Sequence, residues 1–271
     1  MKVNHRISFN LKGRSRALKK FNRLGIKTWA IEDMRFFDIT EDDPRWPRVS
    51  KIIKAKRIPK CTWTKFTKEE ILSAEWIKLA SDYNYGFPMP KGDGSWKKVS
   101  FNCENFCPEC GIGLKQKTPI HLEGEPDLKN NDFMAIYWTY NFFARPEVLD
   151  TMLENNIQGF EILPAINHST NTPLETVKQM KVTNELPSYI VEEELKRDNN
   201  KCEHIKYWVL TRGMLKFHKS SFVNLPDLIR TYEWFGTGHE AIKLTLASAK
   251  FVRLYYENNW KGLFLAPIEL I

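Results

Sequence analysis

Two stretches of this chain follow one sequence plan at a constant offset. Residues 154–164 read ENNIQGFEILP and residues 257–267 read ENNWKGLFLAP, so the offset is 257 − 154 = 103. The identical positions are Glu154/Glu257, Asn155/Asn258, Asn156/Asn259, Gly159/Gly262 and Pro164/Pro267. The apolar positions upstream match at the same offset: Val148/Phe251, Leu149/Val252, Met152/Tyr255 and Leu153/Tyr256. Their spacing of i, i+1, i+4, i+5 places them on one face of a helix.

Each copy is predicted to form a strand, a helix and a second strand. The apolar run at 134–143 suits a buried strand, and Pro146 suits a first helical position. In the second copy, residues 241–246 alternate in polarity and Ser248 suits a helix N-cap. A short amphipathic helix followed by glycine is a common pattern, but the ungapped agreement favours an internal duplication. We therefore expect 134–164 and 241–267 to superpose.

The chain of 271 residues is long enough for one or two domains. Thr67 and Glu70 form a capping box, and the apolar spacing that follows predicts a helix through Leu79. We assign residues 1–95 to a basic, largely helical N-terminal region and 96–271 to the duplicated part. The predicted fold class is α+β: two duplicated strand–helix–strand units sharing a sheet, a zinc-ribbon-like knuckle and a helical N-terminal region.

The cysteines indicate a metal site. Of five cysteines, three cluster at 103, 107 and 110, and Cys107-Pro-Glu-Cys110-Gly has the form of a zinc-ribbon knuckle. A structural zinc ion needs four ligands, and Cys202 and His204 precede the second repeat as Cys107 and Cys110 precede the first. We predict that Zn²⁺ is bound by Cys107, Cys110, Cys202 and His204. The alternatives are Cys103 as the fourth ligand and a knuckle that holds no metal.

The net charge of +8 comes from one end of the chain. The first 31 residues carry nine Lys and Arg and no acid, which leaves 32 basic and 33 acidic residues elsewhere. In this segment Ala17, Leu18, Phe21 and Leu24 define an apolar helical face. Such a basic helix can bind nucleic acid or lie as a solvated surface helix. The candidate nucleic-acid-binding residues are Arg14, Arg16, Lys19, Lys20 and Arg23.

Other features restrict the class of protein. No run reaches the ~20 apolar residues of a membrane span, and the N-terminus lacks the apolar core of a signal peptide. The number of cysteines is odd, which favours free thiols or metal ligands in a reducing compartment. Together these features predict a cytoplasmic protein without a membrane partner. His168 and His239 lie in polar loops outside any recognisable catalytic signature. We therefore predict that the chain is not an enzyme.

The knuckle, the strand–helix–strand units and the second cysteine element together resemble the bacterial double-CxxCG motif proteins. The closing unit is also similar to the carboxyl-terminal unit of immunity proteins of polymorphic toxin systems. The resemblance covers about 103–271 and departs at the second knuckle, where Cys202 is followed by Glu203 and His204 instead of a second Cys-Gly. It implies a non-catalytic protein that binds and neutralises a cognate protein toxin. The alternative is a zinc-ribbon protein that binds nucleic acid through its basic N-terminal arm.

Overall fold

The computed structural model describes residues 1–10, 12, 15–187, 190–199 and 201–271. It divides into two compact units. The first unit contains residues 1–67 and 210–213, and the second contains 68–209 and 214–271. No helix in the described ranges is long and apolar enough to cross a membrane.

The predicted fold class is wrong. The described part of the chain is mostly β-sheet, with 33% of residues in strands and 21% in helices, and its N-terminal region is built on a sheet and is not largely helical. The helical periodicity predicted near the N-terminus corresponds to one short helix, Ser15–Arg23. The helices of this region lie on a sheet whose strands the sequence pattern did not reveal, because charged side chains interrupt their alternation.

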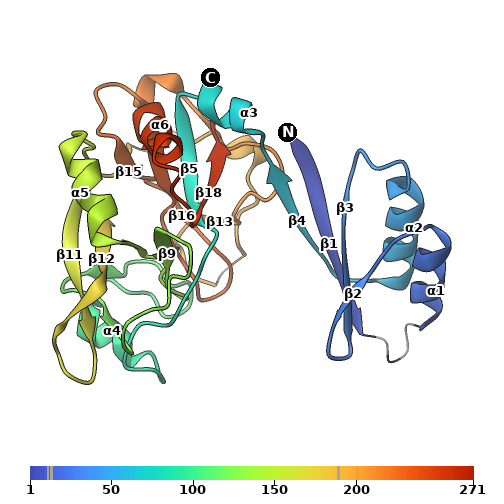
Figure 1. The fold of residues 1–271 in the computed structure, drawn as a ribbon, viewed down its shortest axis with the longest axis horizontal. Helices are drawn as coiled ribbons and strands as arrows, with labels where there is room; N and C mark the ends of the chain where they lie inside the picture. The colour runs from blue at the N-terminus through green and yellow to red at the C-terminus, as the bar shows by residue number, and fades with distance from the viewer. Residues whose placement is uncertain (11, 13–14, 188–189, 200) are drawn as a thin grey trace. The chain divides into compact units, whose positions relative to one another are not determined.

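The first unit is a four-stranded antiparallel sheet with strand order β2-β3-β1-β4. Its elements follow a βαββαβ order: β1 (Lys2–Asn10), α1 (Ser15–Arg23), β2 (Trp29–Ile31), β3 (Met34–Thr40), α2 (Trp46–Lys56) and β4 (Lys60–Lys65). Both helices lie on the same side of the sheet (Figure 1). Their apolar faces share one core with the strands, including Ile7, Phe9, Phe21, Phe37 and Val49. Among the described residues of the first unit, no helix lies on the other face of the sheet.

The second unit contains two larger sheets. One has the order β8-β11-β12-β10-β9 and the other the order β15-β17-β5-β18. The strands of the first are β8 (His121–Leu122), β9 (Phe133–Ala135), β10 (Phe142–Ala144), β11 (Phe160–Asn167) and β12 (Pro173–Val182). Those of the second are β5 (Trp76–Ser81), β15 (Leu228–Arg230), β17 (Thr245–Ser248) and β18 (Leu263–Pro267).

Shorter elements complete this unit. The helices are α3 (Lys68–Ser73), α4 (Ser95–Ser100), α5 (Pro146–Glu154) and α6 (Ala249–Glu257). Three two-stranded pairs are β6 (Phe101–Asn102) with β7 (Lys115–Gln116), β13 (Lys206–Tyr207) with β16 (Trp234–Phe235), and β14 (Lys216–Phe217) with β19 (Glu269–Leu270). The helix predicted through Leu79 ends at Ser73, because Trp76–Ser81 enters a sheet as β5.

The two duplicated segments have the same local topology. Each is a strand, a helix and a strand (β10-α5-β11 and β17-α6-β18), and in each a further strand lies between the outer two, antiparallel to both. Met180 of β12 pairs with Phe142 and Ile162, whereas Leu79 of β5 pairs with Thr245 and Leu265. Both partners differ by 103 residues (245 − 142 and 265 − 162). The segments therefore correspond in register but lie in two sheets, not in the shared sheet that was predicted.

The inserted strands are exchanged between the repeats. We define the first repeat as residues 76–167 and the second as residues 173–270. Strand β5 begins the first repeat but lies in the sheet of the second, and β12 begins the second but lies in the sheet of the first. The residues that follow β5 and β12 also form equivalent backbone hydrogen bonds in the two repeats. Tyr85 N donates to Ala135 O at 3.0 Å, and Leu186 N donates to Arg230 O at 2.7 Å.

Each helix is followed by a close approach to the other repeat. Gly159 and Gly262 have φ of +98° and +104°, in the region that favours glycine. A Cβ atom on Gly159 would overlap Leu228 O of β15, and one on Gly262 would overlap Phe133 O of β9. These two glycines recur at the 103-residue offset because each lets its repeat reach the edge strand of the other repeat's sheet.

We expect Gly159→Ala and Gly262→Ala each to lower the free energy of unfolding by about 2–4 kcal/mol, through backbone strain and overlap with a carbonyl group. Gly124 is the matched control, because a Cβ there meets nothing within 4 Å. Gly124→Ala should change the free energy of unfolding by less than about 0.5 kcal/mol. Urea denaturation followed by tryptophan fluorescence measures all three. Equal stability of the three variants would contradict the proposed close approach.

Candidate metal centre

The first knuckle is a tight turn held by its own backbone. Cys107 N donates to Ile112 O and Gly111 N donates to Cys107 O, both at 2.8 Å. Gly111 has φ of +80°, and a side chain there would overlap His239 O. The turn therefore requires glycine directly after Cys110, and it places the sulfur atoms of Cys107 and Cys110 on one side of the loop.

The second knuckle corresponds to the first in the repeat. Strand β8 pairs with β11 at His121 and Ile166, and β14 pairs with β19 at Lys216 and Glu269. Strands β8 and β14 are thus equivalent in the two repeats and lie 95 residues apart (216 − 121). Cys202 follows Cys107 by the same 95 residues. The second knuckle is shorter by one residue, and His204 takes the place of the second cysteine.

The four predicted ligands lie together. The ligand atoms of Cys107, Cys110, Cys202 and His204 all lie within 4.8 Å of one another. Cys110 Sγ and His204 Nδ1 are 3.4 Å apart. A tetrahedral site with metal–sulfur bonds of ~2.3 Å has edges of about 3.8 Å, so these separations fit one ion among four ligands. The group can hold a metal ion, with two ligands from each repeat.

The two thiols of the first knuckle differ in acidity. Hydrogen bonds from backbone N–H groups, chiefly that of Cys110, lower the pKa of Cys107 to about 6. Burial raises the pKa of Cys110 to about 12. Because thiolates are the ligands of metal ions, binding a cation here would release the Cys110 proton. The backbone hydrogen bonds thus favour the thiolate form of Cys107 before any cation binds. The thiol of Cys110 would lose its proton only when a cation binds.

A buried lysine next to the second knuckle forms hydrogen bonds with the backbone of the first knuckle. Lys206 has no exposed surface, and its Nζ donates to Cys110 O at 2.8 Å, Gly238 O at 2.6 Å and Glu240 O at 2.8 Å. Its charge is paired with Asp198 at 3.4 Å. A buried ammonium group is tolerated only when its donors are satisfied, as here. Lys206 lies two residues after His204, so it couples the second knuckle to the backbone of the first.

Sequence reasoning missed two supporting residues. Lys206 gave no signal, because a lysine in a charged segment is normally on the surface. His239 was treated as a loop histidine, but its Nδ1 lies 2.9 Å from Pro108 O, where it can donate a hydrogen bond to the first knuckle. Neither residue has a spacing that relates it to the cysteines; only the folded chain brings them together.

The remaining candidates lie elsewhere. Cys103 Sγ lies 3.9 Å from Phe101 O and does not belong to the four-residue cluster. Cys61 is exposed in β4 of the first unit. Among the basic candidates, Arg14 lies outside the described residues. The others are exposed on α1 of the first unit: Arg16, Lys19, Lys20 and Arg23.

Comparison with known proteins adds no assignment. No protein-family model matches the chain, and no curated protein matches it.

We expect Cys110→Ser and Cys202→Ser each to lose metal binding and to lower the melting temperature, because an ion held by all four ligands would close the 92 residues between the knuckles (202 − 110). Metal content by mass spectrometry and thermal unfolding by circular dichroism measure both effects. Cys61→Ser is the control and should change neither. Metal retained in Cys202→Ser would mean that the site is confined to the first knuckle.

Proposed function

We propose that this chain is a non-catalytic protein-binding protein that is held together by structural zinc and neutralises a cognate protein toxin. The proposal joins two features of the second unit: the Cys/His cluster and an exposed aromatic loop at residues 137–140. The resemblance to immunity proteins of polymorphic toxin systems points the same way.

The donor set favours zinc in a structural role. Three sulfur ligands and one imidazole nitrogen suit Zn²⁺, and structural zinc sites use four protein ligands. A catalytic zinc site keeps one position open for water or substrate, whereas this cluster supplies four side chains. The ion would then stabilise the exchange between the repeats and leave the surface to bind a partner.

The aromatic loop is the observation that carries the protein-binding proposal. Tyr137, Trp138 and Tyr140 are 42%, 42% and 41% exposed. Trp138 and Tyr140 have φ of +70° and +53°, which is unfavourable for bulky side chains. Within the described ranges, Thr139 Oγ1 and Asn141 Oδ1 are buried without a hydrogen-bond partner. Strain of this kind is concentrated at functional sites, and exposed Tyr and Trp are frequent binding hot spots.

Neighbouring rings hold the loop in place. The Phe87 ring lies 5.0 Å from that of Tyr137 and 4.6 Å from that of Trp138, and the Trp96 ring lies 6.1 Å from that of Trp138. Aromatic contacts at these distances contribute about 0.5–1.5 kcal/mol each. The exposed rings are thus preorganised, which lowers the entropy cost of binding.

We expect the polypeptide encoded by the neighbouring gene to form a stable complex with this protein, burying on the order of 1,600 Å². Trp138→Ala should weaken that complex by about 30-fold or more, corresponding to a hot-spot loss of ~2 kcal/mol. Trp29→Ala is a matched control because Trp29 of the first unit is also 42% exposed. Isothermal titration calorimetry measures the affinities. Equal effects of the two substitutions would exclude the aromatic loop as the binding site.

A second candidate function, nucleic-acid binding, is favoured by the helix-free sheet face of the first unit. Arg6 lies 5.4 Å from the Trp29 ring and 5.6 Å from the Trp63 ring, and Trp29 stacks with Phe36 at 6.0 Å. Aromatic side chains on an open four-stranded sheet can stack bases of a single strand. The basic residues of α1 lie with the helices on the opposite face, so they would not share this surface.

For this second candidate, we expect single-stranded DNA or RNA of mixed sequence to bind with an affinity that falls steeply with salt. Trp29→Ala should weaken binding by about 5- to 150-fold, the loss of one stacked base, whereas Trp138→Ala should not. Fluorescence anisotropy at two salt concentrations measures both. Binding that is unchanged in Trp29→Ala would exclude the sheet face.

A further inference from the structure

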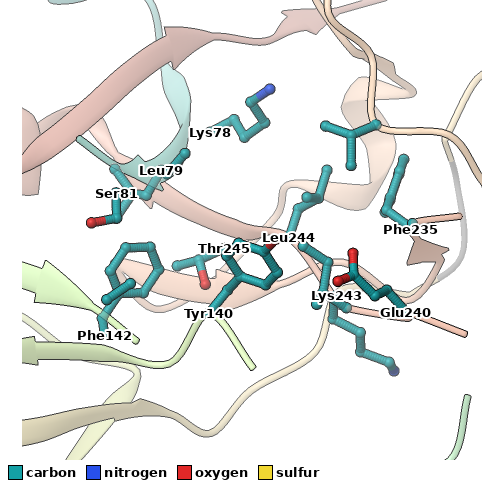
Figure 2. A pocket seen from close by; sticks show the side chains of 15 residues that line it. Lys78, Leu79, Ser81, Tyr140, Phe142, Phe235, Glu240, Lys243, Leu244 and Thr245 are labelled. Carbon is teal, nitrogen blue, oxygen red and sulfur yellow. The ribbon is translucent and has the colours of Figure 1, made fainter. Parts of the chain in front are cut away.

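A largely apolar cavity lies in the second unit, and none of the four metal-ligand candidates lines it. Its volume is about 240 Å³, and it is lined by parts of β5, β10, β16 and β17 and the loop before β17. Apolar walls come from Leu79, Phe142, Phe235 and Ile242. Figure 2 shows the Lys78 side chain extending from β5 on the upper side of the cavity and the rings of Tyr140 and Phe142 on its lower side.

Lys78 differs from the other lysines near this part of the fold. The structure gives its Nζ no acceptor among the residues that it describes. By contrast, Lys206 donates to three carbonyl groups, and Lys243 Nζ donates to Glu185 Oε2 at 2.5 Å. Burial lowers the pKa of Lys78 to about 8, which indicates that its charge is poorly compensated by the protein.

The repeat shows what fills the corresponding position in the other sheet. Lys78 precedes Leu79 as Gln179 precedes Met180, and Leu79 and Met180 occupy equivalent register positions. Gln179 is fully buried, and its side-chain amide exchanges two hydrogen bonds of 2.8 Å with that of Gln116 in β7. In the first sheet, therefore, the polar group on the central strand is satisfied by a side chain of the segment that follows the knuckle.

The equivalent segment of the second repeat goes elsewhere. At the 95-residue offset, Gln116 corresponds to Thr211, and residues 210–213 belong to the first unit. There Gly213 N donates to Thr64 Oγ1 at 2.9 Å, and Arg212 pairs with Glu41 at 2.7 Å. The segment that corresponds to the one carrying Gln116 thus belongs to the first unit, and Lys78 lines the cavity.

We propose that this cavity is a binding site for a small ligand with an apolar body and one carboxylate, which would pair with Lys78. The volume has room for about eight water-sized groups at ~30 Å³ each, which suits a small aromatic acid. The hydroxyl group of Thr245 lines the same cavity on its lower side in Figure 2, opposite Lys78. Glu240 is exposed and lines the cavity as well, so its charge would direct an anionic group away from itself. This inference does not rest on the proposed function, although Tyr140 belongs to both sites.

Benzoate and its neutral analogue benzyl alcohol test the site on the full chain. We expect saturable benzoate binding that is at least about tenfold tighter than that of benzyl alcohol, because a charge-assisted hydrogen bond distinguishes them. In Lys78→Met, benzoate should weaken at least about tenfold, while benzyl alcohol should not weaken. Lys243→Met is the matched control and should retain benzoate affinity, because that amino group is already held by Glu185. Titration by isothermal calorimetry measures all the affinities.

A second measurement keeps the test independent of how the variant folds. Reductive methylation with ¹³C-formaldehyde labels the lysine amino groups of the unaltered chain, and the Lys78 resonance is assigned by its loss in Lys78→Arg. Benzoate should shift this resonance, and benzyl alcohol should not. Equal affinity for the two probes, undiminished benzoate binding by a folded Lys78→Met, or an unmoved Lys78 resonance would each overturn the proposal.

Discussion

The exchange of β5 and β12 between the repeats is the interaction on which the second unit depends. A strand in the middle of a sheet satisfies its backbone groups on both edges, and an unpaired buried N–H or C=O is costly. Between β17 and β18, those bonds come from a strand that lies about 165 residues earlier in the chain (245 − 79 = 166). Neither repeat can complete its sheet alone, so the two must fold together.

The close approaches at Gly159 and Gly262 follow from this exchange. In each repeat, the turn after the helix packs against the edge strand of the other sheet. A backbone N–H group of that turn donates a hydrogen bond to an aspartate carboxylate of the other repeat. Asp132 Oδ2 accepts from Lys261 N at 2.8 Å, and Asp227 Oδ2 accepts from Gln158 N at 3.0 Å. The two bonds are equivalent in the repeat. The Cys/His cluster adds a third reciprocal contact, since each repeat supplies two of its four side chains.

The proposed binding sites lie where the two repeats differ. The first repeat carries the strained loop with Trp138, whose exposed rings suit a protein partner. In the second repeat, residues 210–213 belong to the first unit, and Lys78 lines a cavity. The two repeats thus share one sheet topology, and the candidate sites involve segments in which they differ. A symmetric frame tolerates such changes because its strands are paired through backbone groups, which do not depend on the side chains.

The sequence by itself determined the local features: the repeated helices with their Asn-Asn ends, the following glycines, and the four metal-ligand candidates. These depend on short-range spacing, which a single sequence displays directly. Only the tertiary structure decided that Trp76–Ser81 is a strand, that the N-terminal region is built on a sheet, and that Lys206 and His239 support the knuckles. The reason is physical. The conformation of Trp76–Ser81 is selected by hydrogen bonds to β17 and β18, whose residues follow more than 160 positions later, and no local periodicity records a partner at that distance.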